Sequence, residues 1–302
     1  HPLLIKVLLD IKILKKKILF WCHFSGLGHP KFHKKLINSG IKLILTTNIT
    51  NEVIKKNFPV ISSATVLKNI KKTFKKKKNF FYVGSLHHQK IHQNFAKIIL
   101  QNINIMENFY IYGEDELISE FKKKFNSDLS KKKIIFSGLK KDIQKIYMKY
   151  KYLLYLLKKN HYGSAENILV ESMGDGIIPI VFNNKVEKKL IKNNYNGFIL
   201  NNLKDLKKLL LKIKSGKVPY HKISKNCKNF ARNHYSNKKM INNFDNQYDK
   251  IEVKSQIVFK DLFPQNPKKI FESITENKRS ENLLSDNKSG LNQFLKYFKR
   301  NK

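Results

Sequence analysis

A glycine-rich stretch between two apolar runs contains residues suited to binding phosphate. Residues 161–184 read HYGSAENILVESMGDGIIPIVFNN, and the Ser164 hydroxyl is placed to cap a helix that begins there. Apolar residues continue the helical period from Ile168 until Gly174 stops it. A helix that starts just beyond the carboxyl end of a buried parallel strand presents backbone N–H groups and the positive end of its dipole. The stretch therefore predicts an anion site that fits a diphosphate.

Two acidic residues lie on this expected helix. Glu171 is placed to accept hydrogen bonds from ribose hydroxyls if it faces a crevice, and otherwise it is a solvent-facing glutamate. Glu166 precedes it by about 140° around a helix of 3.6 residues per turn, so the two carboxylates do not share a face. Glu166 is a candidate catalytic residue, and its simpler interpretation is a first-turn acid that complements the helix dipole.

A second turn with suitable chemistry reads GSLHHQK and follows the apolar run FFYV. Gly84 lets the chain turn tightly at the end of that run. Lys90 follows where a loop enters a helix, as a point charge for phosphate oxygens or as one more surface lysine. His87 and His88 have no further ligand spaced to complete a metal site, so we expect an exposed or capping pair and no metal.

The elements that must position these residues alternate along the chain. Apolar runs of strand length are followed by stretches of helical period, the pattern of βα units on a parallel sheet. The expected strands are residues 18–22, 41–45, 80–83, 109–112, 134–136, 152–157, 177–182 and 198–200. The expected helices are residues 31–39, 94–100, 115–125, 142–150, 165–173, 185–192 and 203–213. We therefore expect an α/β protein with a Rossmann-like parallel sheet and helices on both faces.

The same pattern predicts the domain organisation. Residues 1–66 hold too few βα units for a complete Rossmann-like domain. A lysine-rich linker over 67–78 separates them from a nearly complete set over 79–235. A return helix over 236–251 and a largely disordered tail over 252–302 then follow. Because the first residue is a histidine, we expect the chain to be a fragment whose beginning is missing.

The charge and the cysteines narrow the class of protein. The 302 residues include 61 basic and 22 acidic ones, a net charge of +39 that suggests a polyanionic partner. Arginine, the usual reader of bases and phosphates, occurs only at Arg232, Arg279 and Arg300, which favours a solvated lysine surface. Cys22 and Cys227 suggest neither a disulfide framework nor a metal cluster, and they fit a reducing, cytoplasmic location. No apolar run approaches the roughly 20 residues that a transmembrane helix needs.

Residues 80–248 resemble the carboxyl-terminal domain of the family-four retaining glycosyltransferases of GT-B fold. Seven pieces occur in the family's order: YVGSL followed by Lys90, FYIYGED, IIFSGL, KYLLYLL, the glutamate-bearing helix, GIIPIVFNN and NNYNGFIL. The resemblance implies that Lys90 neutralises the donor diphosphate and that Glu171 binds the donor ribose. The donor-binding residues that it implies, together with those predicted above, are Gly84, Ser85, Lys90, Gly113, Ser164, Asn167, Ile168 and Glu171.

This chain departs from the family pattern at two positions. The first glutamate of the family's paired motif falls on Gly163, and Glu166 does not simply replace it. Many members carry an arginine where this chain has Ser85. Residues 1–64 resemble the last βα units of the acceptor-binding domain, and there His23 matches a histidine that often faces the cleft, so a catalytic or sugar-contacting role is implied beside a purely structural one.

Three functions follow as hypotheses. The first is a hexosyltransferase that moves sugar from a nucleotide-sugar donor to the hydroxyl of a glycan or lipid-linked acceptor with retention, in cell-surface glycan or glycolipid synthesis. It needs no cofactor and no specific nucleic acid, and its lysines would hold it at an anionic membrane surface. The second is a degenerate module that binds nucleotide without turnover. The third is a basic nucleic-acid-binding protein, with steep salt dependence and little effect of Glu171.

Overall fold

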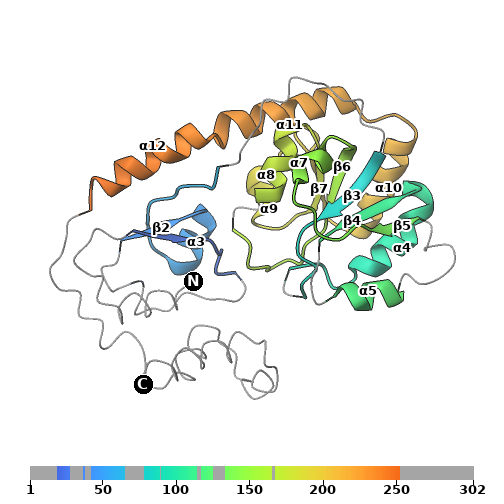
Figure 1. Cartoon of the computed structure of the whole chain (residues 1–302), viewed down its shortest axis with the longest axis horizontal. Coiled ribbons are helices and arrows are strands. Elements are labelled where there is room, and N and C mark those ends of the chain that lie inside the picture. The colour runs from blue at the N-terminus through green and yellow to red at the C-terminus, as the bar shows by residue number, and fades with distance from the viewer. Residues whose placement is uncertain are drawn as a thin grey trace, which may run out of the picture. The chain divides into compact units, whose positions relative to one another are not determined.

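The computed structural model describes residues 19–27, 37, 42–64, 78–88, 90–113, 117–124, 133–164 and 167–251. The chain divides into two compact units, which are coloured by residue number in Figure 1. The larger unit comprises the described residues from Ser62 to Ile241, and the smaller one those up to Ile61 and from Asn242 onward. The expected helix at 31–39, apart from Ile37, and the expected tail at 252–302 lie outside the described residues.

A six-stranded parallel sheet forms the centre of the larger unit. Its strand order is β5-β4-β3-β6-β7-β8, which is the doubly wound Rossmann order when the strands are renumbered from β3. The strands are β3 (Lys78–Val83), β4 (Phe109–Tyr112), β5 (Ile134–Phe136), β6 (Tyr150–Tyr155), β7 (Ile178–Phe182) and β8 (Phe198–Leu200). The predicted α/β class and parallel sheet are confirmed.

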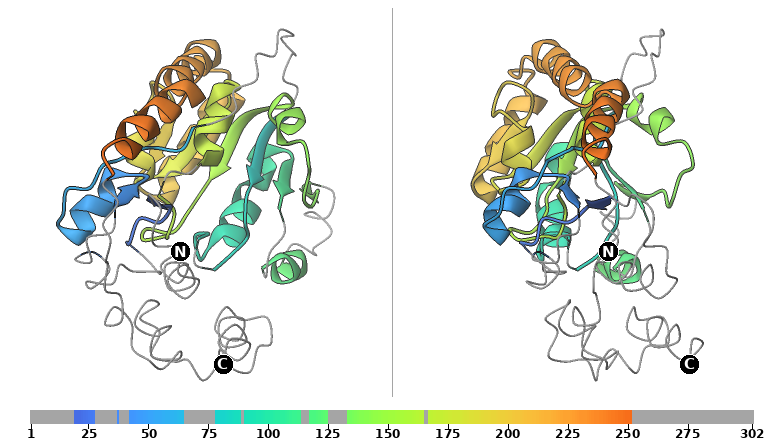
Figure 2. Two further views of the ribbon diagram at one scale, coloured as in Figure 1. Left: turned by 60° about the vertical axis from the view of Figure 1, so that its left-hand side comes forward. Right: turned by 90° about the vertical axis from the view of Figure 1, so that its left-hand side faces the viewer.

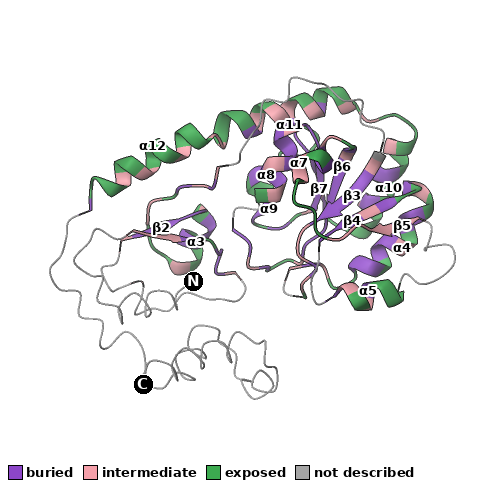
Figure 3. Ribbon diagram, viewed as in Figure 1, coloured by how far each residue is buried: buried purple, intermediate pink, exposed green. Residues whose placement is uncertain are grey.

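Helices cover both faces of this sheet, as the two views of Figure 2 show. Helices α4 and α10 pack against each other on one face, and α8 and α11 pack together on the other. The helices of this unit are α4 (Phe95–Met106), α5 (Ile118–Lys124), α7 (Ile143–Tyr147), α8 (Asn167–Gly174), α9 (Glu187–Leu190), α10 (Leu203–Lys214) and α11 (Tyr220–His234). The strands are buried while the outer helix faces are exposed (Figure 3), which explains why the strand sequences are almost continuously apolar.

Stacked aromatic rings join the two central strands, β3 and β6. Phe80 lies opposite Tyr152 in the strand register, and their ring centroids are 5.5 Å apart. Phe81 stacks on Tyr150 at 4.6 Å, and further along the strands Tyr82 stacks on Tyr155 at 5.8 Å. We call these three pairs the aromatic seam. Each such pair contributes roughly 0.5–1.5 kcal/mol beyond the area that it buries.

Strand β6 differs from the expected strand at 152–157. It starts at Tyr150 and ends at Tyr155, although Leu156 and Leu157 are just as apolar and fully buried. The backbone leaves the sheet there because it pairs with the loop after β3: the His92 N–H donates to the Leu156 carbonyl at 3.1 Å, and Ile91 forms a bridge with Leu157. An apolar run does not reveal where its backbone changes partners.

The smaller unit has a two-stranded parallel sheet of β1 (Phe20–Cys22) and β2 (Leu43–Leu45). Helix α3 (Asn48–Ile54), which was not among the expected helices, follows β2, and the Thr47 side chain accepts a hydrogen bond from an N–H of its first turn. Helix α12 (Asn237–Tyr248) runs across the division between the units, and none of its residues is buried.

Candidate functional site

The strand order places a topological switch point between β3 and β6. From β3 the chain proceeds through α4 to β4 on one side, and from β6 it proceeds through α8 to β7 on the other. In open α/β sheets the loops that diverge at such a point bind ligands outside the carboxyl ends of the strands. The loop after β3 carries Gly84 and Lys90, and the loop after β6 leads into α8, so both predicted phosphate-binding segments lie at this edge.

Gly84 lies against two other predicted donor-binding residues, Gly113 and Ile168, at the switch point. Gly84 has φ +139°, and a Cβ placed there would lie 3.3 Å from the Ile168 Cδ1 atom of α8. Gly113, at the end of β4, has φ +140°, and a Cβ there would lie only 2.1 Å from the Gly84 carbonyl oxygen. The Gly84 N–H also donates to the Tyr112 carbonyl oxygen at 3.0 Å. Glycine is required here because the two backbones approach too closely for any side chain.

Lys90 is connected to this turn through the last pair of the aromatic seam. Its ammonium nitrogen lies 5.5 Å from the centroid of the buried Tyr155 ring, within cation–π range. Tyr155 stacks on Tyr82, and the Tyr82 hydroxyl donates to the Ser85 carbonyl oxygen at 2.8 Å. The seam therefore brings Lys90 and Ser85 to the same edge as Gly84.

Glu171 lies on the face of α8 that also carries Ile168, because residues three apart are neighbours on a helix. It is half-buried, and the Tyr147 hydroxyl of α7 donates to its Oε2 atom at 3.4 Å. Burial raises the pKa of the Glu171 carboxyl above its ordinary 4.5, and the nearby Asp175 carboxylate raises it further, while the Tyr147 hydrogen bond opposes both. A half-buried carboxylate beside the switch point is suited to accepting hydroxyl hydrogen bonds from a ligand.

The remaining predicted residues have separate positions. Ser164 is buried in the loop before α8, and Asn167 is the first residue of α8 and is exposed. Glu166 lies outside the described residues. His23 follows β1 in the smaller unit, where its ring meets Trp21 edge to face at 4.1 Å and burial lowers its pKa below 6.5.

One buried polar cluster has no counterpart among the predicted site residues. His161 and Glu187 are hydrogen-bonded in the interior, although 26 positions separate them in sequence. Their spacing follows no local motif, and the lysines next to Glu187 in its short helix would predict an exposed surface. Only the return of β7 beside β6 brings the two side chains together.

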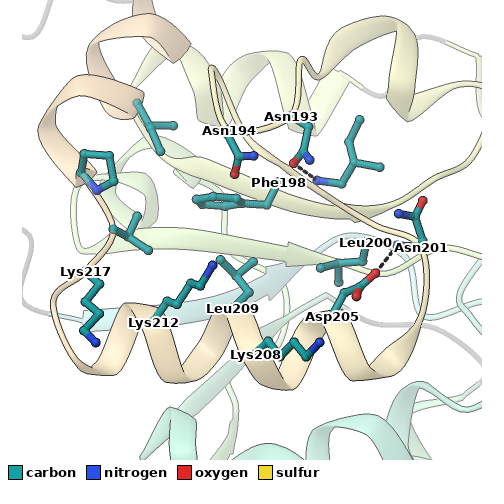
Figure 4. Close-up of a pocket in the computed structure, with 14 residues that line it drawn as sticks. Asn193, Asn194, Phe198, Leu200, Asn201, Asp205, Lys208, Leu209, Lys212 and Lys217 are labelled. Atoms are coloured by element: carbon teal, nitrogen blue, oxygen red, sulfur yellow. Dashed lines mark hydrogen bonds between the residues drawn. The ribbon is translucent and has the colours of Figure 1, made fainter.

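A cavity of about 530 Å³ lies elsewhere, at the outer edge of β8 beside α10 (Figure 4). Side chains block the strand edge here: the Asn193 Oδ1 atom accepts from the Ile199 N–H at 3.0 Å, and an Asp205 oxygen accepts from the Asn201 N–H at 3.0 Å. Lys212 extends toward Phe198 in this cavity, whose lining also includes the apolar side chains of Leu200 and Leu209. No residue predicted to bind donor lines this cavity.

Two further findings concern metals and membranes. Among the residues that the structure describes, no three His, Cys, Asp or Glu side chains gather as a metal site requires. Within the same ranges, no helix is both long and apolar enough to cross a membrane.

Solved structures with a similar fold are GT-B glycosyltransferases. A mutant of S. aureus TarM in complex with fondaparinux, alpha-GlcNAc-glycerol and UDP matches with a TM-score of 0.62 and 16% identity, covering 76% of this chain and 50% of that one. The pneumococcal O-GlcNAc transferase GtfA, in complex with UDP and GlcNAc, matches with a TM-score of 0.65 and 13% identity. This match covers 81% of this chain and 54% of GtfA. Anabaena HepE in complex with UDP matches with a TM-score of 0.65 and 11% identity. This match covers 81% of this chain and 76% of HepE. At these identities the likeness establishes the GT-B fold.

The family follows from the sequence match. The family model described as "Glycosyl transferases group 1" matches residues 64–234, more than half of the chain, so the protein belongs to that family. The predicted resemblance is confirmed. The chain spans about half the length of TarM and GtfA. No curated protein matches the sequence significantly.

The contact between Gly113 and Gly84 predicts a large difference between two glycine substitutions. Gly113→Ala should lower the free energy of unfolding by about 3 kcal/mol or more, because its Cβ would collide with backbone that cannot move aside. Gly216 also has a positive φ, but a Cβ there meets nothing within 4 Å, so Gly216→Ala should cost only about 1 kcal/mol. Urea unfolding measures both variants. Equal losses would show that the close approach is absent.

The raised pKa of Glu171 predicts that its ionised form opposes folding. Because the carboxyl titrates at higher pH in the folded than in the unfolded chain, its contribution to stability is present below pH 4.5 and is lost as the pH rises through the folded value. Glu171→Gln, which stays neutral and can still accept from Tyr147, should therefore raise the urea midpoint at pH 7.5 but not at pH 4. A variant that is less stable than wild type at pH 7.5 would contradict the assigned burial.

Proposed function

We propose that the protein transfers a sugar from a nucleotide-sugar donor to an acceptor hydroxyl, with retention of the anomeric configuration. The observation that carries the proposal is the convergence of Gly84, Gly113 and Ile168 at the switch point, with Lys90 held beside Tyr155 at the same edge. Membership of the glycosyl transferase group 1 family supports it. Three structures of similar fold contain UDP, which makes UDP-sugars the first donors to test.

The proposed chemistry is mainly stabilisation of negative charge. As the bond between sugar and diphosphate breaks, charge develops on the phosphate oxygens, and Lys90 with the backbone N–H groups of Asn167 and Ile168 would stabilise it. Glu171 would hold the ribose. No metal or other cofactor is part of this step. His23 and Glu166 are the candidate residues for contacts to the sugar and the acceptor.

The acceptor and the place of action belong to the same proposal. A hexose is the sugar class that we propose, with a glycan or lipid-linked molecule as acceptor in cell-surface glycan or glycolipid synthesis. The lysine-rich surface would attract an anionic membrane that carries such an acceptor. A cytoplasmic location with peripheral membrane contact fits this role.

Position 163 favours a second candidate function, nucleotide binding without transfer. Gly163 is buried, its N–H donates to a His161 ring nitrogen, and as a glycine it offers no carboxylate at this position. The two functions separate in one assay. Release of UDP from a panel of UDP-sugars with acceptor extracts supports transfer. UDP binding in the absence of any release supports the binding module.

The proposal predicts a specific loss on removal of one lysine. Lys90→Ala should weaken UDP binding by about 10- to 100-fold, since a charge-assisted contact contributes about 1.5–3 kcal/mol. Lys207→Ala on α10 changes the net charge equally from an exposed position and is the matched control. Isothermal titration calorimetry at fixed salt measures both variants.

Equal effects of the two lysine substitutions would contradict the proposed site. They would favour binding driven by overall charge, as in a basic nucleic-acid-binding protein, whose affinity falls steeply with salt. A loss of UDP affinity confined to Lys90→Ala supports the site.

A further inference from the structure

The buried pair of His161 and Glu187 lies in the loops next to the proposed donor site. The two side chains are 1% and 0% exposed, and the His161 Nε2 atom lies 3.1 and 3.2 Å from the two carboxylate oxygens of Glu187. His161 stands in the loop between β6 and α8, and Glu187 is the first residue of α9, after β7. The pair therefore ties together two loops at the carboxyl edge of the sheet.

The hydrogen bonds of His161 show which of its two ring nitrogens carries the proton. The Gly163 N–H donates to His161 Nδ1 at 3.1 Å, so Nδ1 is an acceptor and carries no proton. The ring proton is then on Nε2, where it is donated to Glu187. Through this arrangement the ring holds the backbone at Gly163, one residue before Ser164 and close to the start of α8.

Asn184 extends the cluster to the other loop of the site. Its Nδ2 atom donates to Glu187 Oε1 at 3.1 Å and to the Leu157 carbonyl oxygen at 3.2 Å. The next residue, Lys158, donates its N–H to the Lys90 carbonyl oxygen at 3.0 Å. One continuous series of hydrogen bonds thus runs from the backbone of Lys90 to the backbone of Gly163.

We propose that Asn184, Glu187 and His161 form a brace that sets the position of the Lys90 turn relative to the amino end of α8. The inference rests on the proposed function, in which these two segments hold one diphosphate. All three members are positioning residues, since they act through Lys90 and the α8 backbone. The brace explains why a buried carboxylate and its hydrogen-bond partners are present although apolar residues of similar volume are often as stable.

Two substitutions of His161 each keep one of its two hydrogen-bond contacts and remove the other. His161→Asn places an amide oxygen near the Nδ1 position and can still accept from Gly163, but it loses Glu187. His161→Gln places an amide nitrogen near the Nε2 position and can still donate to Glu187, but it loses Gly163. Both should weaken UDP binding by about tenfold or more, as removal of the partners that orient a site's ligands commonly does. His221→Gln, at an exposed position on α11, is the control and should bind within twofold of wild type.

Coupling to Lys90 distinguishes positioning from loss of stability. Residues that act as a unit are non-additive, whereas distant independent ones add. In the His161→Asn background, the further change Lys90→Ala should weaken UDP binding by less than about threefold, far less than in wild type. A full, additive loss in that background would overturn the brace.

Hydrogen exchange of the ligand-free protein tests the brace without nucleotide. In His161→Asn, the amides of His92 and Lys158 should exchange faster because the link to Glu187 is broken, while the amide of Gly163 keeps its acceptor and should change less. Unchanged exchange at His92 and Lys158 would also overturn the brace. Asn184→Leu, which removes the amide donor at similar size, replaces His161→Asn if that variant does not fold. If wild type binds none of UDP, GDP or ADP, the proposed function fails, and the exchange result still decides whether the brace exists.

Discussion

The aromatic seam between β3 and β6 is the contact on which the rest of this unit depends. These strands lie where the two halves of the doubly wound sheet meet, and three stacked ring pairs join them across that boundary. The rings are large and almost fully buried, so a change in strand register would separate them and expose apolar surface. The seam thereby fixes how the carboxyl ends of β3 and β6, from which the ligand-binding loops emerge, are aligned along the strand direction. Its last pair, Tyr82 and Tyr155, also contacts Ser85 and Lys90 directly.

The backbone contact between Gly84 and Gly113 adds a second constraint. Two neighbouring strands end in glycines with positive φ, and their chains approach until a methyl group no longer fits. This packing leaves room for Ile168 of α8 to lie against Gly84. The helix that we propose to face the diphosphate is thus positioned by contacts to the turn that leads to Lys90, and a substitution at Gly113 should disturb both.

Charged groups around the switch point are arranged at some cost to stability. Burial disfavours the ionised Glu171, and the His161–Glu187 pair is held in an interior where charge is expensive unless it is fully hydrogen-bonded. In both places, neighbouring polar groups satisfy the carboxylate, namely Tyr147 for Glu171, and Asn184 with His161 for Glu187. Such groups are more easily explained by a role toward a ligand than by a contribution to folding.

The amino-acid sequence by itself determined the α/β class and the strands at 109–112, 134–136 and 198–200, whereas Gly113 and Ile168 entered the expected site only through the family resemblance. The class and the strands followed from local patterns, since short apolar runs form buried strands in a parallel sheet. Only the tertiary structure decided that β6 ends at Tyr155 and that His161 meets Glu187. Both depend on partners distant in sequence, because hydrogen bonds to another loop select among equally apolar residues and side chains 26 positions apart meet only after the sheet has formed.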